Sequence, residues 1–577
     1  MVSFIRLLWP PPSPISQRAG PKSSINVLPD DVLLEVFDFC RLENIFAWNH
    51  ERWYKLVHTC RRWRHIIFSS PSRLDLQLSC TYGTPVADML SHSPPLPLIV
   101  DYSGQRPLPT NDEEGALLAL QNHDRVRQIH LYASIVSLDK LLAVMDRPFP
   151  VLEELSLRRA IENPDANEDE VDEDDEINSP RLPQAFQASQ LRHLSLVRVG
   201  DVIEVGLPHL TSFSGLVSLF LLGIPFSAYL SLEYLASSLS FMPQLEHLGL
   251  QFTFSAPSYD ISGELINVPN AKPITLPNLS EIFFEGESSY LEGLAARISA
   301  PLLTSFCVTF FEEPSSTLSH LSRLLSEAAE LRLPVASIKF SGPRIYHTSA
   351  IMCMADTLDL DPDITPPFQL VFRCAWLNVQ VAAAGQICTA FTPILSAVET
   401  LLLDLDDGGR FQIGTVSIED AWHDLLRPFC NVETLLVGAH LTRDMTRALW
   451  PDNSGQSMAI LPQLCELARP DYAHFGDAFD QLIAARRDAG QHIIKSQRSP
   501  TPNSDSEEED DDEDESDSDS EEDKEEEGRV KLAVEGQREG KGSDPDTDTD
   551  KKDPDSGTND NLEISTALDS DSDFDFE

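Results

Sequence analysis

Few side chains in this sequence have the type and spacing that catalysis or metal binding requires. His58, Cys60 and His65 lie close together, but no further ligands follow at the spacing of a zinc site. The glycine-containing run from Gly536 to Gly542 is one residue short of a phosphate-binding loop, and no strand precedes it. Asp404 to Gly408 lacks the closing Glu of a calcium loop. We interpret these three features as a helix face, a linker and a turn.

The remaining candidates for chemistry are equally sparse. The sequence has neither a GxSxG nor an HExxH motif, so no nucleophile or metalloprotease setting is indicated. Its nine cysteines are odd in number and have no CxxC spacing, which favours reduced thiols in a cytoplasmic or nuclear protein. We therefore expect a protein that is not an enzyme and needs neither a cofactor nor a metal.

The stretch from Leu28 to Phe68 predicts two or three short helices. Pro29 suits a first helical turn, and Asp30 and Asp31 favour the positive end of the helix dipole. Two apolar stripes follow at helical spacing, formed by Leu33, Val36, Phe37 and Cys40 and by Leu56, Thr59, Cys60, Trp63 and Ile67. About forty residues cannot close a large core alone. This helical unit must share its apolar surface with another body.

Four groups of these residues resemble the F-box motif: Leu28-Pro29, Leu33-Leu34, Val36-Phe37 and the string from Cys60 to Arg64. With Arg73 to Leu78 and Val100 to Tyr102, the chain is similar to the F-box proteins of mushroom-forming (basidiomycete) fungi. Cys40, where the motif usually has Leu, and a long connection to the second helix depart from the family pattern. The alternative is an ordinary two-helix piece of a core with a chance Leu-Pro pair.

The resemblance implies a docking surface for the Skp-family adaptor of an SCF-type ubiquitin ligase. Through this adaptor the chain would join a cullin-RING ligase. The adaptor-binding residues that it implies are Leu28, Pro29, Leu33, Leu34, Val36, Phe37, Cys60 and Trp63.

From about residue 120 the sequence repeats one apolar pattern, with apolar residues at positions n, n+3 and n+5. Ten full copies begin at Val126, Leu152, Leu191, Leu216, Leu245, Leu279, Leu303, Val335, Val398 and Val432, and Leu464-Leu467 is a partial one. Their spacings are 24 to 39 residues, except for one gap of 63 that predicts a further unit around Phe368-Leu370-Phe372. This pattern is typical of leucine-rich repeats.

The repeat pattern predicts an α/β fold. Each copy would place a short strand in a shared core, and the following segment, as in Ser319 to Leu331, would return as a helix. A helix from Phe479 to Arg487 would cap the end of the stack. Because the copies are degenerate, an ordinary α/β domain with frequent strands is the alternative.

The net charge of −50 is concentrated in two segments. Residues 505–577 hold 33 acidic and 7 basic side chains, and Glu162 to Glu176 holds ten acidic and no basic ones. Nucleic-acid and membrane-surface binding are not expected, because phosphate recognition needs a basic footprint.

The sequence predicts neither a signal peptide nor a membrane span. The short apolar segment at the N-terminus is ended by Pro10 to Pro12 before it reaches the length of a signal peptide, and the sequence has no run of about 18 apolar residues.

These observations predict five regions. Residues 1–24 are a disordered lead-in, 25–70 an F-box, 71–119 a connector, 120–495 a leucine-rich-repeat domain with an acidic loop at 162–180, and 496–577 a disordered acidic tail. The tail carries sequences that suit proline-directed or acid-directed kinases at Ser499, Thr501, Ser504, Ser506, Ser516, Ser518 and Ser520. A tail that only solvates the protein is the alternative.

Together these features favour a non-catalytic substrate-recognition subunit of an SCF-type ubiquitin ligase. The helical unit would bind the adaptor, and the repeats would bind a protein substrate whose identity is not encoded in a motif. The alternatives are a leucine-rich interaction scaffold and a binder of histones or other basic proteins through the acidic tail.

Overall fold

The computed structural model describes residues 25–42, 52–81, 85–104, 112–160, 182–199, 207–225, 231–253, 273–314, 318–341, 349–357, 366–374, 377–405, 418–451, 460–469 and 477–497. The chain divides into the units Met1–Pro502 and Asn503–Glu577. The lead-in, the acidic loop and residues 498–577 of the tail, with its seven expected phosphorylation sites, lie outside the described residues, so the expectations about them stay predictions. Ser496 and Gln497, which we expected in the disordered tail, instead end the strand Ile494–Gln497.

The described N-terminal residues form three helices: α1 (Asp30–Leu42), α2 (Arg52–Val57) and α3 (Arg61–Ser69), after a short 3-10 turn at Ile25–Val27. Cys60 begins α3 as its N-cap, and its sulfur accepts a hydrogen bond from the Trp63 backbone N–H at 3.5 Å. We call residues 25–69 the N-terminal helical unit.

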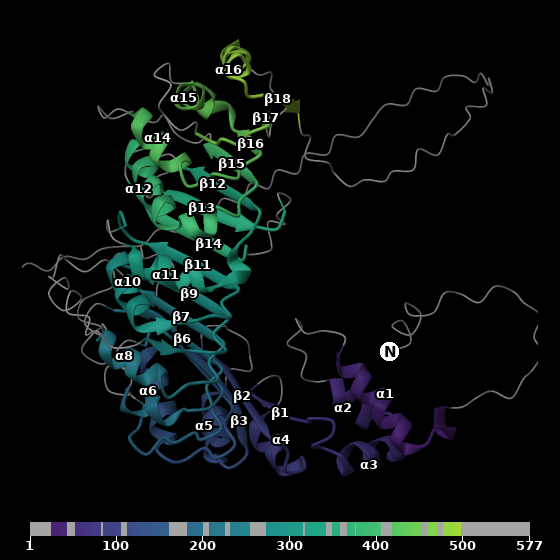
Figure 1. Cartoon of the computed structure of the whole chain (residues 1–577). Coiled ribbons are helices and arrows are strands. Elements are labelled where there is room, and N and C mark those ends of the chain that lie inside the picture. The colour runs from purple at the N-terminus through teal and green to yellow at the C-terminus, as the bar shows by residue number, and fades with distance from the viewer. Residues whose placement is uncertain are drawn as a thin grey trace, which may run out of the picture. The chain divides into compact units, whose positions relative to one another are not determined.

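A mostly parallel sheet of sixteen strands follows (Figure 1). Its strands are β1 (Leu78–Cys80), β2 (Leu98–Ser103), β3 (Val126–Ala133), β4 (Glu154–Arg159), β5 (His193–Val197), β6 (Ser218–Ile224), β7 (His247–Phe252), β9 (Glu281–Gly286), β11 (Ser305–Phe310), β12 (Val335–Phe340), β13 (Ser349–Ala355), β14 (Phe368–Arg373), β15 (Thr400–Leu405), β16 (Thr434–Val437), β17 (Glu466–Arg469) and β18 (Ile494–Gln497). A separate parallel pair joins β8 (Ile274–Thr275) to β10 (Ile298–Ser299).

The connecting helices lie along one face of this sheet (Figure 1). They are α4 (Val86–His92), α5 (Glu113–Gln121), α6 (Ile135–Val144), α8 (Leu232–Leu239), α10 (Ser288–Arg297), α11 (Ser319–Glu327), α12 (Leu377–Ala390), α13 (Thr392–Leu395), α14 (Ile418–Leu426), α15 (Thr442–Ala448) and α16 (Asp477–Asp488). The apolar side chains at alternate strand positions point toward them into one continuous core. The opposite face of the sheet carries no helix within the described residues, and we call it the open face.

The repeat pattern predicted the strands well. In all ten copies, the n+3 and n+5 residues lie on a strand and are buried, and in nine of the copies these residues share one pairing frame. They also pair in register, as Leu155 does with Leu194 and Leu219 does with Leu248. The large parallel sheet is therefore compatible with the expected leucine-rich-repeat solenoid.

One copy was placed in the wrong frame. The sequence put Val335, Ile338 and Phe340 in the repeat positions, but Ala336 pairs with Leu401 and Ile338 pairs with Leu403. The frame is therefore shifted by two residues and begins at Leu333. Strand residues alternate between faces, so a shift of two residues leaves Ile338 and Phe340 pointing inward. The difference is visible only at the first position, where Val335 is half-buried.

The long gap hides a reversal of strand order. The predicted strand at Phe368 exists, but it pairs with β11, while β12 lies two strands further along the sheet. Between them runs β13, antiparallel to both β12 and β14, which the sequence did not predict. The spatial order is therefore β11, β14, β13, β12 and β15.

The sheet is longer than the repeat pattern indicated at both ends. The range 71–119, for which we expected a connector, contributes β1 and β2. These strands pair in parallel with each other, and β2 also pairs in parallel with β3. After the expected final helix α16, the chain adds β18 beside β17. The pattern missed these strands because they lack the full n, n+3, n+5 series.

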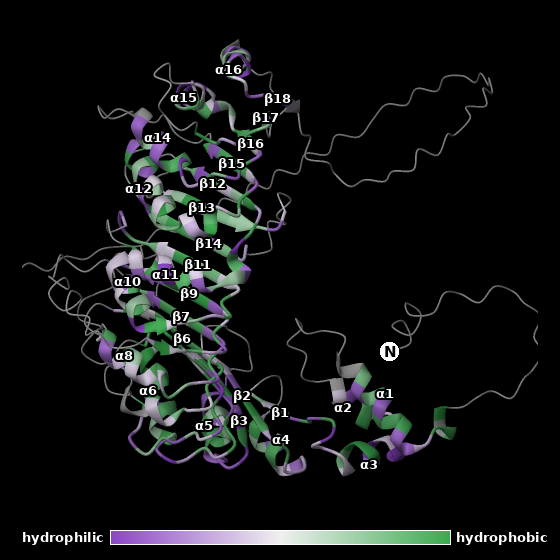
Figure 2. Cartoon of the chain, viewed as in Figure 1, coloured by the Kyte–Doolittle hydropathy of each residue, from purple (hydrophilic) through white to green (hydrophobic). Residues whose placement is uncertain are grey.

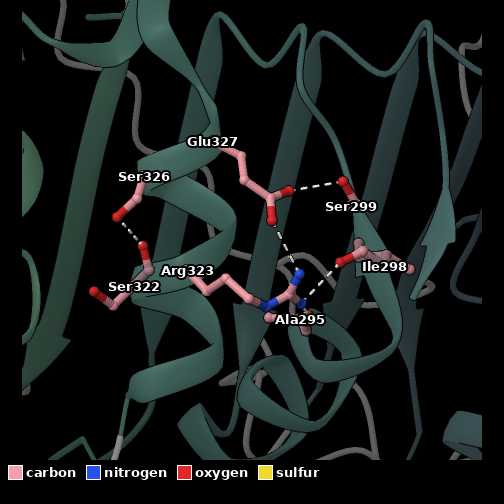
Figure 3. A network of polar contacts seen from close by, with 7 residues as sticks. All are labelled: Ala295, Ile298, Ser299, Ser322, Arg323, Ser326 and Glu327. Carbon is pink, nitrogen blue, oxygen red and sulfur yellow. Dashed lines mark hydrogen bonds and ion pairs between the residues drawn. The ribbon is translucent and has the colours of Figure 1, made fainter. Parts of the chain in front are cut away.

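Polar side chains of α11 form hydrogen bonds with the end of the neighbouring helix α10, in the middle of the stack. Arg323 of α11 donates to the carbonyl oxygens of Ala295 and Ile298 at 2.5 and 3.1 Å and pairs with Glu327 at 3.1 Å (Figure 3). Glu327 also accepts from the Ser299 hydroxyl at 2.7 Å. These bonds satisfy the carbonyl groups at the end of α10, which have no partner inside their own helix.

A buried arginine connects the last helix, α16, to the repeats before it. Arg486 of α16 donates to the carbonyl oxygens of Leu449 and Ile460 at 2.9 and 3.0 Å and to the Gln491 side chain at 3.1 Å. Burial lowers the pKa of Arg486 to about 10. Its two carbonyl partners belong to two chain segments that precede α16, so this residue ties the final helix to the stack.

Candidate protein-binding surfaces

Helix α1 has an inward face that holds the N-terminal helical unit together. Leu33 and Phe37 are buried, and the rings of Phe37 and Trp63 meet edge to face with centroids 4.9 Å apart. Aromatic pairs in this geometry stabilise by about 0.5–1.5 kcal/mol beyond their area burial. This contact joins α1 to α3.

The outward face of α1 is also apolar. Val32, Val36 and Phe39 follow at i, i+4 and i+7 and are 39%, 37% and 65% exposed. Ile25 and Val27, just before the helix, are exposed as well. Hydrophobic and hydrophilic segments alternate along α1 (Figure 2). We call these five residues the apolar stripe; such a cluster on a surface marks an interaction site more often than scattered apolar residues do.

The eight residues expected to bind an adaptor fall into three groups. Leu33, Leu34 and Phe37 are buried in the helical unit, Leu28, Cys60 and Trp63 are half-buried, and Pro29 and Val36 are exposed. The side chain of Cys40 lies outside the described residues. Val32 and Phe39 were missed, although their spacing from Val36 could have indicated them.

Polar contacts hold the helices that present the stripe. Arg62 of α3 donates to Asp30 at 2.6 Å and to the Leu28 carbonyl oxygen at 2.6 Å. Arg73 pairs with Glu35 of α1. The indole N–H of Trp53 donates to the Gln77 carbonyl oxygen at 3.0 Å, just before β1. These contacts are partly exposed, so we expect each to orient the helices more than to stabilise them.

The open face of the sheet presents a second candidate surface. Across β5 to β9, the Ser218 hydroxyl lies 3.1 Å from Nδ1 of His193 and 3.3 Å from Nδ1 of His247, and Nε2 of His247 lies 3.7 Å from Glu281. A serine beside a histidine and a glutamate has the composition of a hydrolytic triad. However, the Ser218 N–H donates to the Arg192 carbonyl oxygen, so it cannot stabilise an oxyanion. The group is better described as a hydrogen-bonded ladder.

His130 forms a separate contact near the start of this face. Its Nε2 lies 3.1 Å from Glu154, and its pairing neighbour on β2 is Asp101. Burial opposes protonation of the ring, but the hydrogen bond that the ring donates to Glu154 and the charges of Glu154 and Asp101 outweigh it. The pKa of His130 is therefore raised above its ordinary value.

This raised pKa gives a pH-dependent stability. Because the folded-state pKa exceeds the unfolded one, the contribution is complete below the unfolded pKa of about 6.5 and is lost as pH rises through the folded pKa. We expect the difference in melting temperature between the wild type and His130→Gln to be larger at pH 5.5 than at pH 9. A difference that is constant over this range would contradict the ion pair with Glu154.

The described residues contain no group of three or more His, Cys, Asp or Glu side chains that could hold a metal ion. No helix in the described part of the chain is both long and apolar enough to cross a bilayer.

Comparison with known proteins adds little to this description. No protein-family model and no curated protein matches the sequence. Among solved structures, the chain is similar to the leucine-rich repeat-containing protein LegL7 from Legionella pneumophila, at 12% identity and a TM-score of 0.23, over 72% of this chain and 98% of that chain. A TM-score this low does not establish a shared fold, and the repeat architecture stands on the strand register alone.

Proposed function

We propose that this chain is a protein-interaction scaffold that acts as the substrate receptor of an SCF-type ubiquitin ligase. Its N-terminal helical unit binds an Skp-family adaptor, and the open face of the sheet binds the protein target. The chain itself performs no chemistry. Its contribution is proximity, because holding target and conjugating enzyme in one assembly raises their effective concentration.

The observation that carries the proposal is the position of the apolar stripe. Three of its five residues lie on α1, which carries the Val36-Phe37 pair and begins directly after Leu28-Pro29, the two pairs that resemble the F-box motif. Helix α1 uses its inward face for the contact with Trp63, and Val36 and Phe39 on its outward face stay exposed. Burial of each side chain against a partner would stabilise a complex by about 1.5–3 kcal/mol.

The test changes the stripe without changing the core of the helical unit. We expect Val36→Asp combined with Phe39→Asp to weaken binding of the full-length protein to a purified Skp-family adaptor about 100-fold or more, because both side chains lose apolar burial. Isothermal titration calorimetry measures the affinity, and circular dichroism checks that the helices remain folded.

The matched control is Val136→Asp on α6, where the valine is 60% exposed. This variant adds a charge at an exposed apolar position outside the N-terminal unit and should bind the adaptor like the wild type. If the wild type does not bind the adaptor, or the stripe variant binds it unchanged, the receptor function is wrong.

A further inference from the structure

The register of the open face aligns one residue from each strand in a continuous row across the sheet. We call it the central row. Its members from β4 to β18 are Ser156, Ser195, Phe220, Gly249, Phe283, Cys307, Gln369, Cys353, Ser337, Leu402, Leu436, Ala468 and Ser496. With strands about 4.8 Å apart, this row extends over about 58 Å. Its members on β16 and β17 are covered, since Leu436 is 5% and Ala468 0% exposed. The row crosses the reversed strands without interruption, because the antiparallel β13 places Cys353 beside both Ser337 and Gln369.

Between β4 and β18 the central row contains no Asp, Glu, Lys, Arg or His, whereas the same register continues on β3 and β2 to His130 and Asp101. The row on one side of it, two residues earlier on each parallel strand, includes Glu154, Glu281 and Glu466. The row on the other side includes Arg158, Glu285, Lys339 and Asp404. Charged side chains are therefore tolerated on the open face but absent from the central row between β4 and β18.

The aromatic residues of the central row lie together on β6 to β9. Gly249 lies between Phe220 and Phe283 in the register. A Cβ atom at Gly249 would come within 2.2 Å of the Phe220 ring, so that ring lies across the glycine. Both phenylalanines remain half-buried within the described residues. They give the row a broad apolar surface where a large side chain of a partner could pack.

From this arrangement we propose that the open face binds an extended protein segment whose residues along the central row are uncharged and mostly apolar. A charged residue placed over the row would lose water without meeting an opposite charge, which is costly. The proposal names the class of target segment for the receptor function and rests on that function for its biological role.

The charges beside the row also define the edges of this segment. The row that includes Glu154 and Glu281 contains acidic residues and histidines but no Lys or Arg among the described strands. A target segment with Lys or Arg along this edge would complement it. The expected ligand is therefore an uncharged, apolar core with a basic flank.

The probe is a library of random 16-residue peptides displayed on phage and selected against the full-length protein. An extended peptide of this length spans about 53 Å, close to the length of the row. We expect enriched peptides to share an uncharged run with Leu, Ile, Phe or Tyr and to carry Lys or Arg on a flank. Failure to enrich any peptide, or enrichment of peptides with charged central runs, would overturn the proposal.

Two variants that add a charge test whether the selected peptides bind over the central row. Gln369→Glu keeps the size of the side chain and adds a negative charge to the middle of the row, and we expect it to weaken the selected peptides about tenfold or more. Ser195→Glu repeats the test on β5. The matched control, Gln128→Glu, adds the same charge on β3 outside the central row, beside Glu154, and should bind equally well or more tightly. Unchanged peptide binding by both folded central-row variants would contradict the proposal.

The same variants separate this inference from the receptor function. Both central-row variants should still bind the Skp-family adaptor, because their changes lie outside the N-terminal helical unit. If peptides bind as expected but the wild-type protein fails to bind the adaptor, the receptor function is wrong and the ligand class of the open face stands. If the adaptor binds but the peptide results fail, only the ligand class is wrong.

Discussion

Replacement of Leu248 by Asp is expected to unfold the middle of the sheet. Leu248 is 1% exposed and lies between Leu219 of β6 and Ile282 of β9. A carboxylate buried there without a partner costs several kcal/mol, which is a large part of the stability of a typical domain. Because each repeat contacts mainly its neighbours, the loss should spread to β6 and β9 before it reaches the ends of the sheet.

Hydrogen exchange read out by mass spectrometry can follow this loss along the chain. The backbone amides of β6, β7 and β9 should exchange fastest in the Leu248→Asp variant, and its melting temperature should fall. Gln244→Asp adds a charge at an exposed position just before the same strand and should change neither quantity. Equal melting of both variants would show that Leu248 does not face the core.

Phe37→Ala is expected to destabilise the N-terminal helical unit by about 3–5 kcal/mol, because a large buried ring is removed and the pocket beside Trp63 is left unfilled. Adaptor binding should fall with it. This loss would come from unfolding, whereas the Val36→Asp and Phe39→Asp changes should reduce binding with the helices intact.

Unfolding and loss of the binding surface can be told apart by how strongly the backbone amides of α1 and α3 are protected from hydrogen exchange. We expect Phe37→Ala to lose this protection and the stripe variant to keep it. If Phe37→Ala leaves the amides protected yet abolishes adaptor binding, Phe37 itself belongs to the interface, and the assignment of an inward and an outward face to α1 is wrong.

The sequence was most informative where one strand face must be buried. The n, n+3, n+5 pattern located nine strands in the correct frame because those positions face the helices in every repeat. It was less informative for β12, where Leu333 and Ala336 hold the repeat positions and the more apolar Val335 and Phe340 dominate the pattern. The pattern missed β13 because this strand runs antiparallel, and it missed β18, whose apolar residue Ile494 is exposed to solvent.

The candidate binding surfaces were less accessible from the sequence. Helical spacing grouped Leu33, Val36 and Phe37 on one face of a helix, but the structure buries Leu33 and Phe37 and exposes Val36. Apolarity alone does not tell which residues a small helical unit keeps for its own core. The central row was also missed, because its members are adjacent only through strand pairing and lie tens of residues apart in the chain.

The reversed order of β12 to β14 affects how the protein can be assembled during synthesis. After β11 leaves the ribosome, the next strand made is β12, which does not pair with it. The edge of β11 must wait for β14, whose residues begin at Phe368, nearly sixty positions after Phe310. At about 5–20 residues per second, this wait lasts roughly 3–12 seconds. During that interval the nascent chain exposes the unpaired edge of β11, so we expect chaperones to bind the nascent chain at this point of synthesis.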